Sequence, residues 1–210
     1  MSVSAVHILH VLQKNDLKIF RTADVMTLTG LQPSSATHAL QRLTKQHLLI
    51  KVKRGLWLSE PTQDISAHEL LPFLTTPWPA YVSLYSALSQ YSVVEEVPHI
   101  IYGVTSGRPG KIQTLFGSFH LHHLPDRLMW GYETKRTLHG FVPIAEPEKA
   151  FLDLAYLALI PRSGLEMPHK RGRKWKLDAK KLWICAKKFK FKPLENFLKK
   201  NMRPHIFVSQ

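Results

Sequence analysis

The sequence has little cysteine and no long apolar run. Cys185 is the only cysteine among 210 residues, so no disulfide can form within one chain, and the composition fits a reducing cytosol. A single thiol also excludes a zinc or iron–sulfur site built from several cysteines of one chain. No stretch approaches the roughly 20 apolar residues of a membrane-spanning helix. We therefore expect a cytoplasmic protein that makes no membrane contact.

Acidic residues are also scarce, because 15 Asp and Glu stand against 29 Lys and Arg, a formal charge of +14. Residues 1–60 carry eight basic and three acidic side chains, a net +5. Residues 61–160 carry six and nine, a net −3, and residues 161–210 carry fifteen and three, a net +12. This distribution predicts contact with a polyanion at two separate places, with solubility as the competing explanation of the basic tail.

Signatures of catalysis are missing. Residues 103–110 lack the glycine spacing of a phosphate-binding loop. Glu146 and Glu148 are two residues apart and do not share a helix face, so helix capping explains them better than catalysis does. Asp153 lies one helical turn after Lys149, and we interpret the two as an ion pair. The pattern therefore predicts no catalytic residue, and we expect that the protein is not an enzyme.

Metal-ligating and nucleophilic residues are equally sparse. His120 and His122 share one face of a predicted strand, but His123 points to the other and no carboxylate lies in the same strand. We interpret them as surface residues. Cys185 lies on a lysine-rich helix that could lower its pKa, but no motif marks it as a nucleophile. Neither a metal nor a cofactor is predicted.

The strongest signal is residues 21–58, which have the pattern of a short helix, a glycine turn, a second helix and a basic hairpin. Thr22 is a suitable N-cap for the first helix, and Leu28 is expected to face inward. Gly30 can take the left-handed conformation that ends a helix, and Pro33 suits the first position of the next. This is the order of a winged helix-turn-helix, which places one helix in the DNA major groove.

The second of these helices predicts a DNA-reading surface. Its buried face is expected to contain Ala36, Leu40 and Leu43, whereas its other positions hold short hydroxyl, amide and guanidinium donors suited to phosphates and base edges. Basic residues at the hairpin tip suit the phosphate backbone. An ordinary solvated helix face is the alternative, which the flanking turn and hairpin disfavour. The predicted DNA-contacting residues are Thr22, Ser34, Ser35, Thr37, His38, Gln41, Arg42, Lys45, Lys51, Lys53 and Arg54.

The remaining chain divides by composition. Four prolines in residues 61–79 indicate a linker between a winged helix-turn-helix domain (1–60) and an α+β domain (80–160), and a short helix is expected within the linker over 65–71. We predict helices over 80–90 and 147–157, with a small antiparallel sheet between them. Its strands are expected within 97–105, 111–115, 118–124, 128–133 and 141–144. The fold class is therefore α+β, with a basic helical C-terminal region (161–210).

Two helices are expected in that last region, over 178–189 and 193–201. Lysines on an amphipathic helix commonly form only its wet face, but their density here also predicts a polyanion or an acidic partner. This secondary basic surface consists of Lys170, Arg171, Arg173, Lys174, Lys180, Lys181, Lys187 and Lys188.

Three segments carry a resemblance to a known family. The first reads FRTADVMTLTGL, SATHALQRLTKQHLL and IKVKRGLWL. The second reads PAYVSLYSALSQYSVVEEVPHIIYGVTSGRP, followed by TLFGSFHLHHL. The third, the most specific, reads GFVPIAEPEKAFLDLAYL. In this order they resemble the AbiEi family of type IV antitoxins, and the resemblance covers roughly residues 18–160.

The resemblance implies a DNA-binding antitoxin that represses its own operon. The N-terminal domain would bind inverted repeats of double-stranded DNA in the promoter, as two copies, and the C-terminal domain would counteract a nucleotidyltransferase-like toxin. Residues 162–210 are more basic than the resemblance leads us to expect, which leaves DNA, RNA and protein open as their partners. A winged-helix regulator without a toxin is the alternative. An enzyme acting on nucleic acid would require an acidic or histidine–metal site, which the sequence does not indicate.

Overall fold

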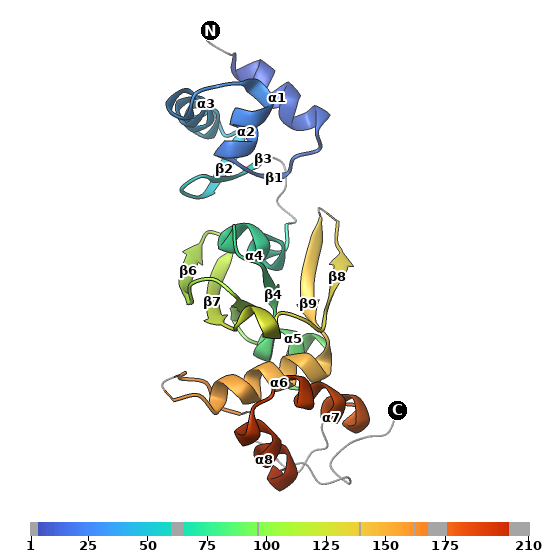
Figure 1. Cartoon of the computed structure of the whole chain (residues 1–210). Coiled ribbons are helices and arrows are strands. Elements are labelled where there is room, and N and C mark those ends of the chain that lie inside the picture. Colours follow the sequence, from blue (N-terminus) through green and yellow to red (C-terminus); the bar gives the residue numbers. More distant parts are fainter. Residues whose placement is uncertain are drawn as a thin grey trace.

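The computed structural model describes residues 4–59, 65–95, 97–138, 140–161, 163–167 and 176–201 (Figure 1). The architecture is mixed α+β, with a three-stranded antiparallel sheet near the N-terminus and a six-stranded mixed sheet after it. We call residues 4–59 the head and the described residues from 65 to 201 the body. No helix in these described parts is long and apolar enough to cross a membrane.

The head combines three helices with its small sheet. In chain order its elements are α1 (Ala5–Lys14), β1 (Ile19–Arg21), α2 (Thr22–Thr29), α3 (Pro33–Lys45), β2 (Leu49–Lys53) and β3 (Leu56–Ser59). Strands β2 and β3 form an antiparallel hairpin, and β1 pairs with the other edge of β3, so that Phe20 lies opposite Trp57. Both aromatic side chains are buried in a core that also contains Ile8, Leu40 and Leu43.

The turn between α2 and α3 has the predicted geometry. Gly30 ends α2 with a φ of 70°, in the left-handed region where a side chain adds strain. Pro33 occupies the first turn of α3, where its missing N–H removes no helical hydrogen bond. Ala36, Leu40 and Leu43 are buried on α3 as predicted. Local backbone chemistry thus accounts for the α2–turn–α3 unit.

Two predictions about α2 are wrong. Arg21 is the N-cap, and its backbone N–H donates to Oδ2 of Asp24 at 2.6 Å, so Thr22 is the first helical residue. Leu28 is 41% exposed. Because α2 has only eight residues and buries only Val25, its last turn extends beyond the core.

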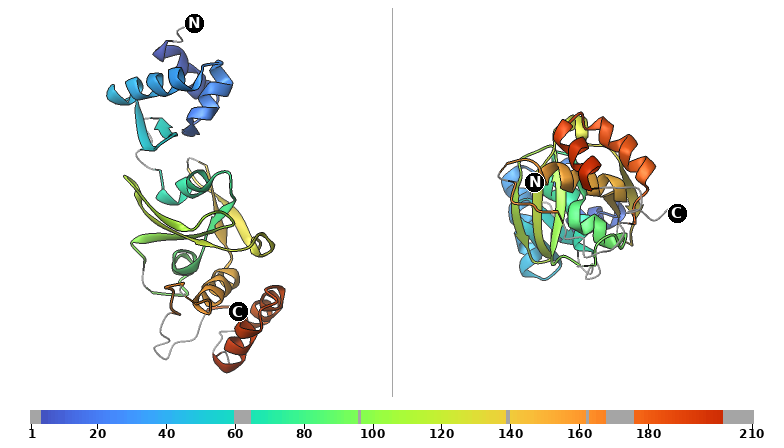
Figure 2. Two further views of the ribbon diagram at one scale, coloured as in Figure 1. Left: turned by 60° about the vertical axis from the view of Figure 1, so that its left-hand side comes forward. Right: turned by 90° about the horizontal axis from the view of Figure 1, so that it is seen from below.

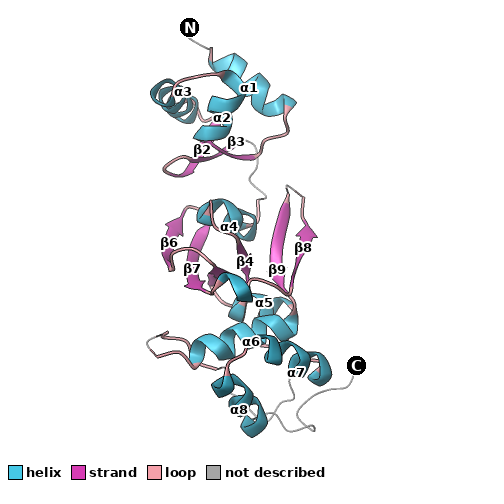
Figure 3. Cartoon of the chain, viewed as in Figure 1, coloured by secondary structure: helices cyan, strands magenta, loops and turns pink. Residues whose placement is uncertain are grey.

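The body contains the larger sheet and five α-helices within its described residues. Its elements are α4 (Ala67–Thr75), β4 (Ala80–Val82), α5 (Leu84–Gln90), β5 (Ile100–Thr105), β6 (Gly110–Thr114), β7 (Gly117–His123), the 3₁₀ turn η1 (Asp126–Leu128), β8 (Tyr132–Arg136), β9 (Phe141–Ala145), α6 (Pro147–Ala158), α7 (Ala179–Lys188) and α8 (Lys192–Asn201). Figure 3 shows these helices and strands by type.

The predicted antiparallel sheet is mixed. Its strand order is β6-β7-β5-β4-β9-β8, and the pairs β5–β7 and β4–β9 are parallel. Strand β6 lies at the outer edge of the sheet and pairs antiparallel with β7. Strand β7 lies between β6 and β5 and runs parallel to β5. Hydrophobic alternation indicates that a segment is a strand but not which neighbour it pairs with, which is why the sequence led to the simpler antiparallel arrangement.

Element boundaries also differ in three places. The first residues of the helix predicted over 80–90 form β4, and the strand predicted over 128–133 is replaced by η1 and the later β8. The short helix expected over 65–71 within the linker is α4, which runs from Ala67 to Thr75, and its buried leucines pack in the body core. Helices α7 and α8 share that same core through buried apolar side chains, although the sequence indicated a separate C-terminal region.

The helices of the body cover the sheet on two sides. Helix α4 lies between the sheet and the head, whereas α5 and α6 lie on the side away from the head (Figures 1 and 2). Helix α7 packs on α6, and α8 packs on α7. Ten of the twelve residues of α6 are buried, which makes it the central helix of the body.

Head and body contact each other through the sheet of the head and α4. The Nζ atom of Lys53 donates to the backbone oxygen of Leu74 at 2.8 Å, and the Arg21 guanidinium donates to the hydroxyl of Thr76. Ile19 from β1 and apolar side chains from β2 and β3 belong to the same buried cluster as the body core. The two units therefore share apolar packing as well as polar contacts.

Candidate nucleic-acid interface and buried ionic cluster

Helix α3 presents the predicted polar surface to solvent. The predicted residues Ser34, Ser35, His38, Gln41, Arg42 and Lys45 are all exposed. Thr37 is half-buried, and its hydroxyl donates to the backbone oxygen of Pro33 at 2.8 Å, so that its donor already has a partner. The remaining exposed set leaves hydroxyl, imidazole, amide, guanidinium and ammonium donors free to meet phosphates and base edges.

Two of the three basic residues predicted on the β2–β3 hairpin are exposed and available to contact DNA. Lys51 is exposed, with its Nζ atom 5.8 Å from the centre of the Trp57 ring, and Arg54 is exposed at the turn. Lys53 instead points to the body, where it donates to Leu74. Partial burial and the nearby charge of Arg21 lower the pKa of Lys53. We therefore withdraw Lys53 from the candidate DNA-contacting set.

Thr22 also has a different role. Its hydroxyl accepts a hydrogen bond from the indole N–H of Trp57 at 2.9 Å, and Trp57 is 1% exposed. The bond satisfies the only polar donor of a buried tryptophan side chain. Thr22 therefore stabilises the head and is withdrawn from the candidate set with Lys53.

Of the described residues of the secondary basic surface, three are exposed and one forms ion pairs within the protein. Lys180, Lys187 and Lys188 are exposed. Lys181 lies 3.4 Å from a carboxylate oxygen of Glu146 and 3.3 Å from one of Glu148. The other predicted members, Lys170, Arg171, Arg173 and Lys174, lie outside the described residues.

Glu146 is the N-cap residue of α6 and Glu148 lies in its first turn, as predicted, although no side-chain hydrogen bond caps the helix. Glu148 is 5% exposed, and one of its oxygens accepts the backbone N–H of Asp178 at 3.0 Å. Together with the ion pairs to Lys181, this bond fixes the start of α7 against α6. The two carboxylates therefore connect helices.

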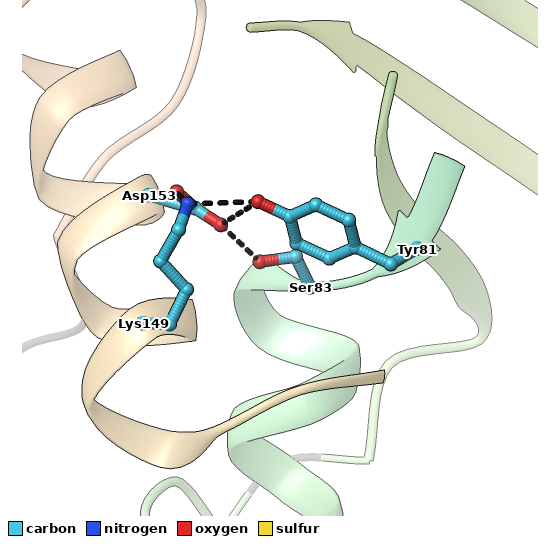
Figure 4. Close-up of polar contacts among 4 residues, drawn as sticks. All are labelled: Tyr81, Ser83, Lys149 and Asp153. Carbon is cyan, nitrogen blue, oxygen red and sulfur yellow. Dashed lines mark hydrogen bonds and ion pairs between the residues drawn. The ribbon is translucent and has the colours of Figure 1, made fainter. Parts of the chain in front are cut away.

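The structure contains a buried ionic cluster of Lys149, Asp153, Tyr81 and Ser83 (Figure 4). Lys149 and Asp153 form the ion pair predicted from their spacing on α6, and both side chains are 0% exposed. The Nζ atom of Lys149 also donates to the Tyr81 hydroxyl at 2.7 Å. Tyr81 and Ser83 donate to Oδ2 of Asp153 at 3.0 and 2.9 Å. Each charged group thus has several partners.

Tyr81 and Ser83 could not be assigned to this cluster from the sequence. They lie in β4 and directly after it, 72 and 70 residues before Asp153. The only local signal is the spacing of Lys149 and Asp153 in a largely apolar helix. Aromatic rings also surround the ammonium group of Lys149. Its Nζ atom lies 4.9 Å from the ring centre of Trp130 and 5.1 Å from that of Phe189.

Burial dominates the electrostatics of the cluster. It raises the pKa of Asp153 and lowers that of Lys149, while the attraction between the two opposes both shifts. Burial and the negative charge of Asp153 raise the pKa of Tyr81 well above its usual value. Because neither charged side chain reaches solvent, the cluster can join β4 to α6 but has no exposed atom with which to meet a substrate.

The two histidines and the cysteine considered in the sequence as possible metal ligands or nucleophiles pack against neighbouring side chains. His120 and His122 pack around the Tyr102 ring, and burial lowers the pKa of both imidazoles. Burial raises the pKa of the Cys185 thiol, contrary to the lowering that its lysine-rich helix suggested. Among the described residues, no group of three or more His, Cys, Asp or Glu is placed to hold a metal ion.

Comparison of the sequence with models of known protein families and with curated proteins found no match.

Proposed function

We propose that the protein is a DNA-binding transcriptional regulator whose head is a winged helix-turn-helix. Helix α3 would enter the major groove, and the β2–β3 hairpin would contact the phosphate backbone. The observation that carries the proposal is the two-sided character of α3. Its apolar side is buried in the head, while its donor-rich side is exposed together with Lys51 and Arg54 of the hairpin.

The resemblance extends the proposal to an autorepressor of a toxin–antitoxin operon. Two copies would bind an inverted repeat, and the body would counteract a nucleotidyltransferase-like toxin. The segment that carries the resemblance most specifically, residues 140–157, includes β9 and α6. Because α6 is almost wholly buried, this segment supports a shared fold more than a shared binding surface. That observation keeps a regulator without a toxin as the second candidate.

A salt-dependent gel-shift titration tests DNA binding by the head. The probe is the DNA directly upstream of the protein's own reading frame, and the variant is Arg42→Ala with Arg54→Ala. Each phosphate contact contributes about 0.9 to the slope of log affinity against log salt, so the double variant should lower that slope by about 1.8 if both side chains contact phosphates. Lys53→Ala is the matched control, because its ammonium group faces the body. An unchanged affinity and slope in the double variant would refute this interface.

Co-expression separates the two candidates. The full chain is produced with the neighbouring gene, and growth is scored for the wild type and for Arg42→Ala with Arg54→Ala. The antitoxin proposal expects both to rescue growth, because the antitoxin surface is assigned to the body, while only the wild type represses the operon. A neighbouring gene that does not impair growth on its own, or an impairment that the wild type fails to relieve, would favour the regulator without a toxin.

A further inference from the structure

A pocket of about 390 Å³ lies between head and body. The loop between α1 and β1, with the start of β1, forms its head side. Helix α4 and the β8–β9 hairpin form its body side. Pockets of a few hundred cubic ångströms suit small organic ligands more than macromolecules.

The side chain that distinguishes this pocket is Glu69 of α4. Glu69 lines the pocket and is 2% exposed, and its Oε2 atom is buried without a hydrogen-bond partner. The other buried carboxylates among the described residues differ: Asp153 is paired with Lys149, and Glu148 is paired with Lys181. A buried carboxylate oxygen without a hydrogen-bond partner is costly, so Oε2 of Glu69 lacks the donor or cation that would stabilise it.

The rest of the lining indicates what that missing partner is. Phe73 and Phe141 contribute aromatic rings, and Leu17 and Ile19 contribute aliphatic surface. Lys18 is the only basic residue among the described residues of the lining, and its Nζ atom lies 3.8 Å from a carboxylate oxygen of Asp16. Aromatic rings attract cations through their faces. Two carboxylates, one lysine and apolar walls therefore suit a ligand with one positive charge and an apolar group.

We propose that this pocket binds a small organic monocation, with an ammonium or amidinium group at Glu69 and an apolar group against Phe73 and Phe141. Such a ligand would contact head and body at once and would stabilise their relative placement. The proposal concerns ligand binding alone and does not depend on the DNA-binding function.

Isothermal titration of the full chain with benzylamine, in the absence of DNA, tests the site. We expect saturable binding at one site per chain. Benzyl alcohol, which has the same ring without the charge, should bind at least tenfold more weakly. Glu69→Gln should weaken benzylamine binding at least tenfold, whereas Glu195→Gln, a carboxylate replacement outside the pocket on α8, should leave it unchanged.

A second variant covers the case in which Glu69→Gln does not fold, as judged by circular dichroism. Phe141 is 59% exposed, so Phe141→Ala should fold normally and still weaken benzylamine binding several-fold. Three results would overturn the proposal: no saturable binding of benzylamine, equal binding of benzyl alcohol, or wild-type affinity in both pocket variants. Because no DNA is present, each of these results leaves the proposed DNA-binding function unaffected.

Discussion

Replacing Lys149 with methionine should strongly destabilise the protein. Methionine keeps most of the apolar stem of lysine but removes the ammonium group. Asp153, which is fully buried, would then keep only the hydrogen bonds from Tyr81 and Ser83. An uncompensated buried charge of this kind costs about 3–5 kcal/mol in unfolding free energy. For a protein of this size the loss corresponds to a fall of about 6–20 °C in Tm.

Urea unfolding at pH 7 measures the effect, and Lys135→Met is the matched control. Lys135 also pairs with a carboxylate, Glu133 at 3.4 Å, and lies 4.4 Å from the centre of a tyrosine ring, that of Tyr91. It is solvent-exposed, however, so its removal should cost less than about 1 kcal/mol. The two variants therefore compare the loss of a lysine from a buried lysine–carboxylate pair with the same loss from an exposed one.

The double replacement of Lys149→Met and Asp153→Leu separates charge from packing. No buried charge remains, so the double variant should cost about 2 kcal/mol less than the sum of the two single variants. Some loss persists because the hydroxyls of Tyr81 and Ser83 lose their acceptor. Equal costs for Lys149→Met and Lys135→Met, or strict additivity in the double variant, would refute the description of a buried, coupled cluster.

Three other predictions concern single side chains. Thr22→Val should lower stability by about 1–3 kcal/mol in thermal melts, because it leaves the Trp57 indole N–H unsatisfied; a loss of DNA affinity without destabilisation would contradict it. Gly30→Ala should cost about 1–2 kcal/mol in urea unfolding through backbone strain alone, since its φ is 70° and no atom lies within 4 Å of the added methyl; an unchanged midpoint would contradict it. The pKa of Tyr81 is higher in the folded state than its unfolded value of about 10, so Tyr81 contributes to stability below about pH 10. Above that pH the unfolding free energy falls by about 1.4 kcal/mol per pH unit. Tyr81→Phe should therefore show a shallower decline in stability above about pH 10, and parallel curves would contradict the shift.

The sequence and the structure agree best where one short segment contains all the information. The end of α2 at Gly30, the start of α3 at Pro33 and the buried side of α3 follow from backbone preference and helical periodicity. The Asp178 cap of α7 is a further example, because its carboxylate accepts the backbone N–H of Lys181 only three residues away. Such contacts form within a single turn, so their residues are visible in the local pattern.

Basic residues illustrate the limit of this reasoning. Lys51, Lys53 and Arg54 are equivalent in the sequence, yet Lys53 contacts α4 of the body and the other two face solvent. Lys180 and Lys181 are adjacent, yet only Lys181 contacts the carboxylates of α6. Composition gives the charge of a segment, whereas the packing of distant elements determines which of its charges remain available to a partner.

The sequence by itself determined the head's helix–turn–helix order, the helical spacing of Lys149 and Asp153, and the basic excess at both ends of the chain. Only the tertiary structure decided the mixed strand order, the meeting of Tyr81 and Ser83 with Asp153, and the placement of Glu69 in a pocket between head and body. The physical reason is the distance along the sequence over which each interaction acts. Helix and turn preferences act over a few residues, whereas sheet pairing and the burial of charge depend on segments that the chain brings together from 70 residues apart.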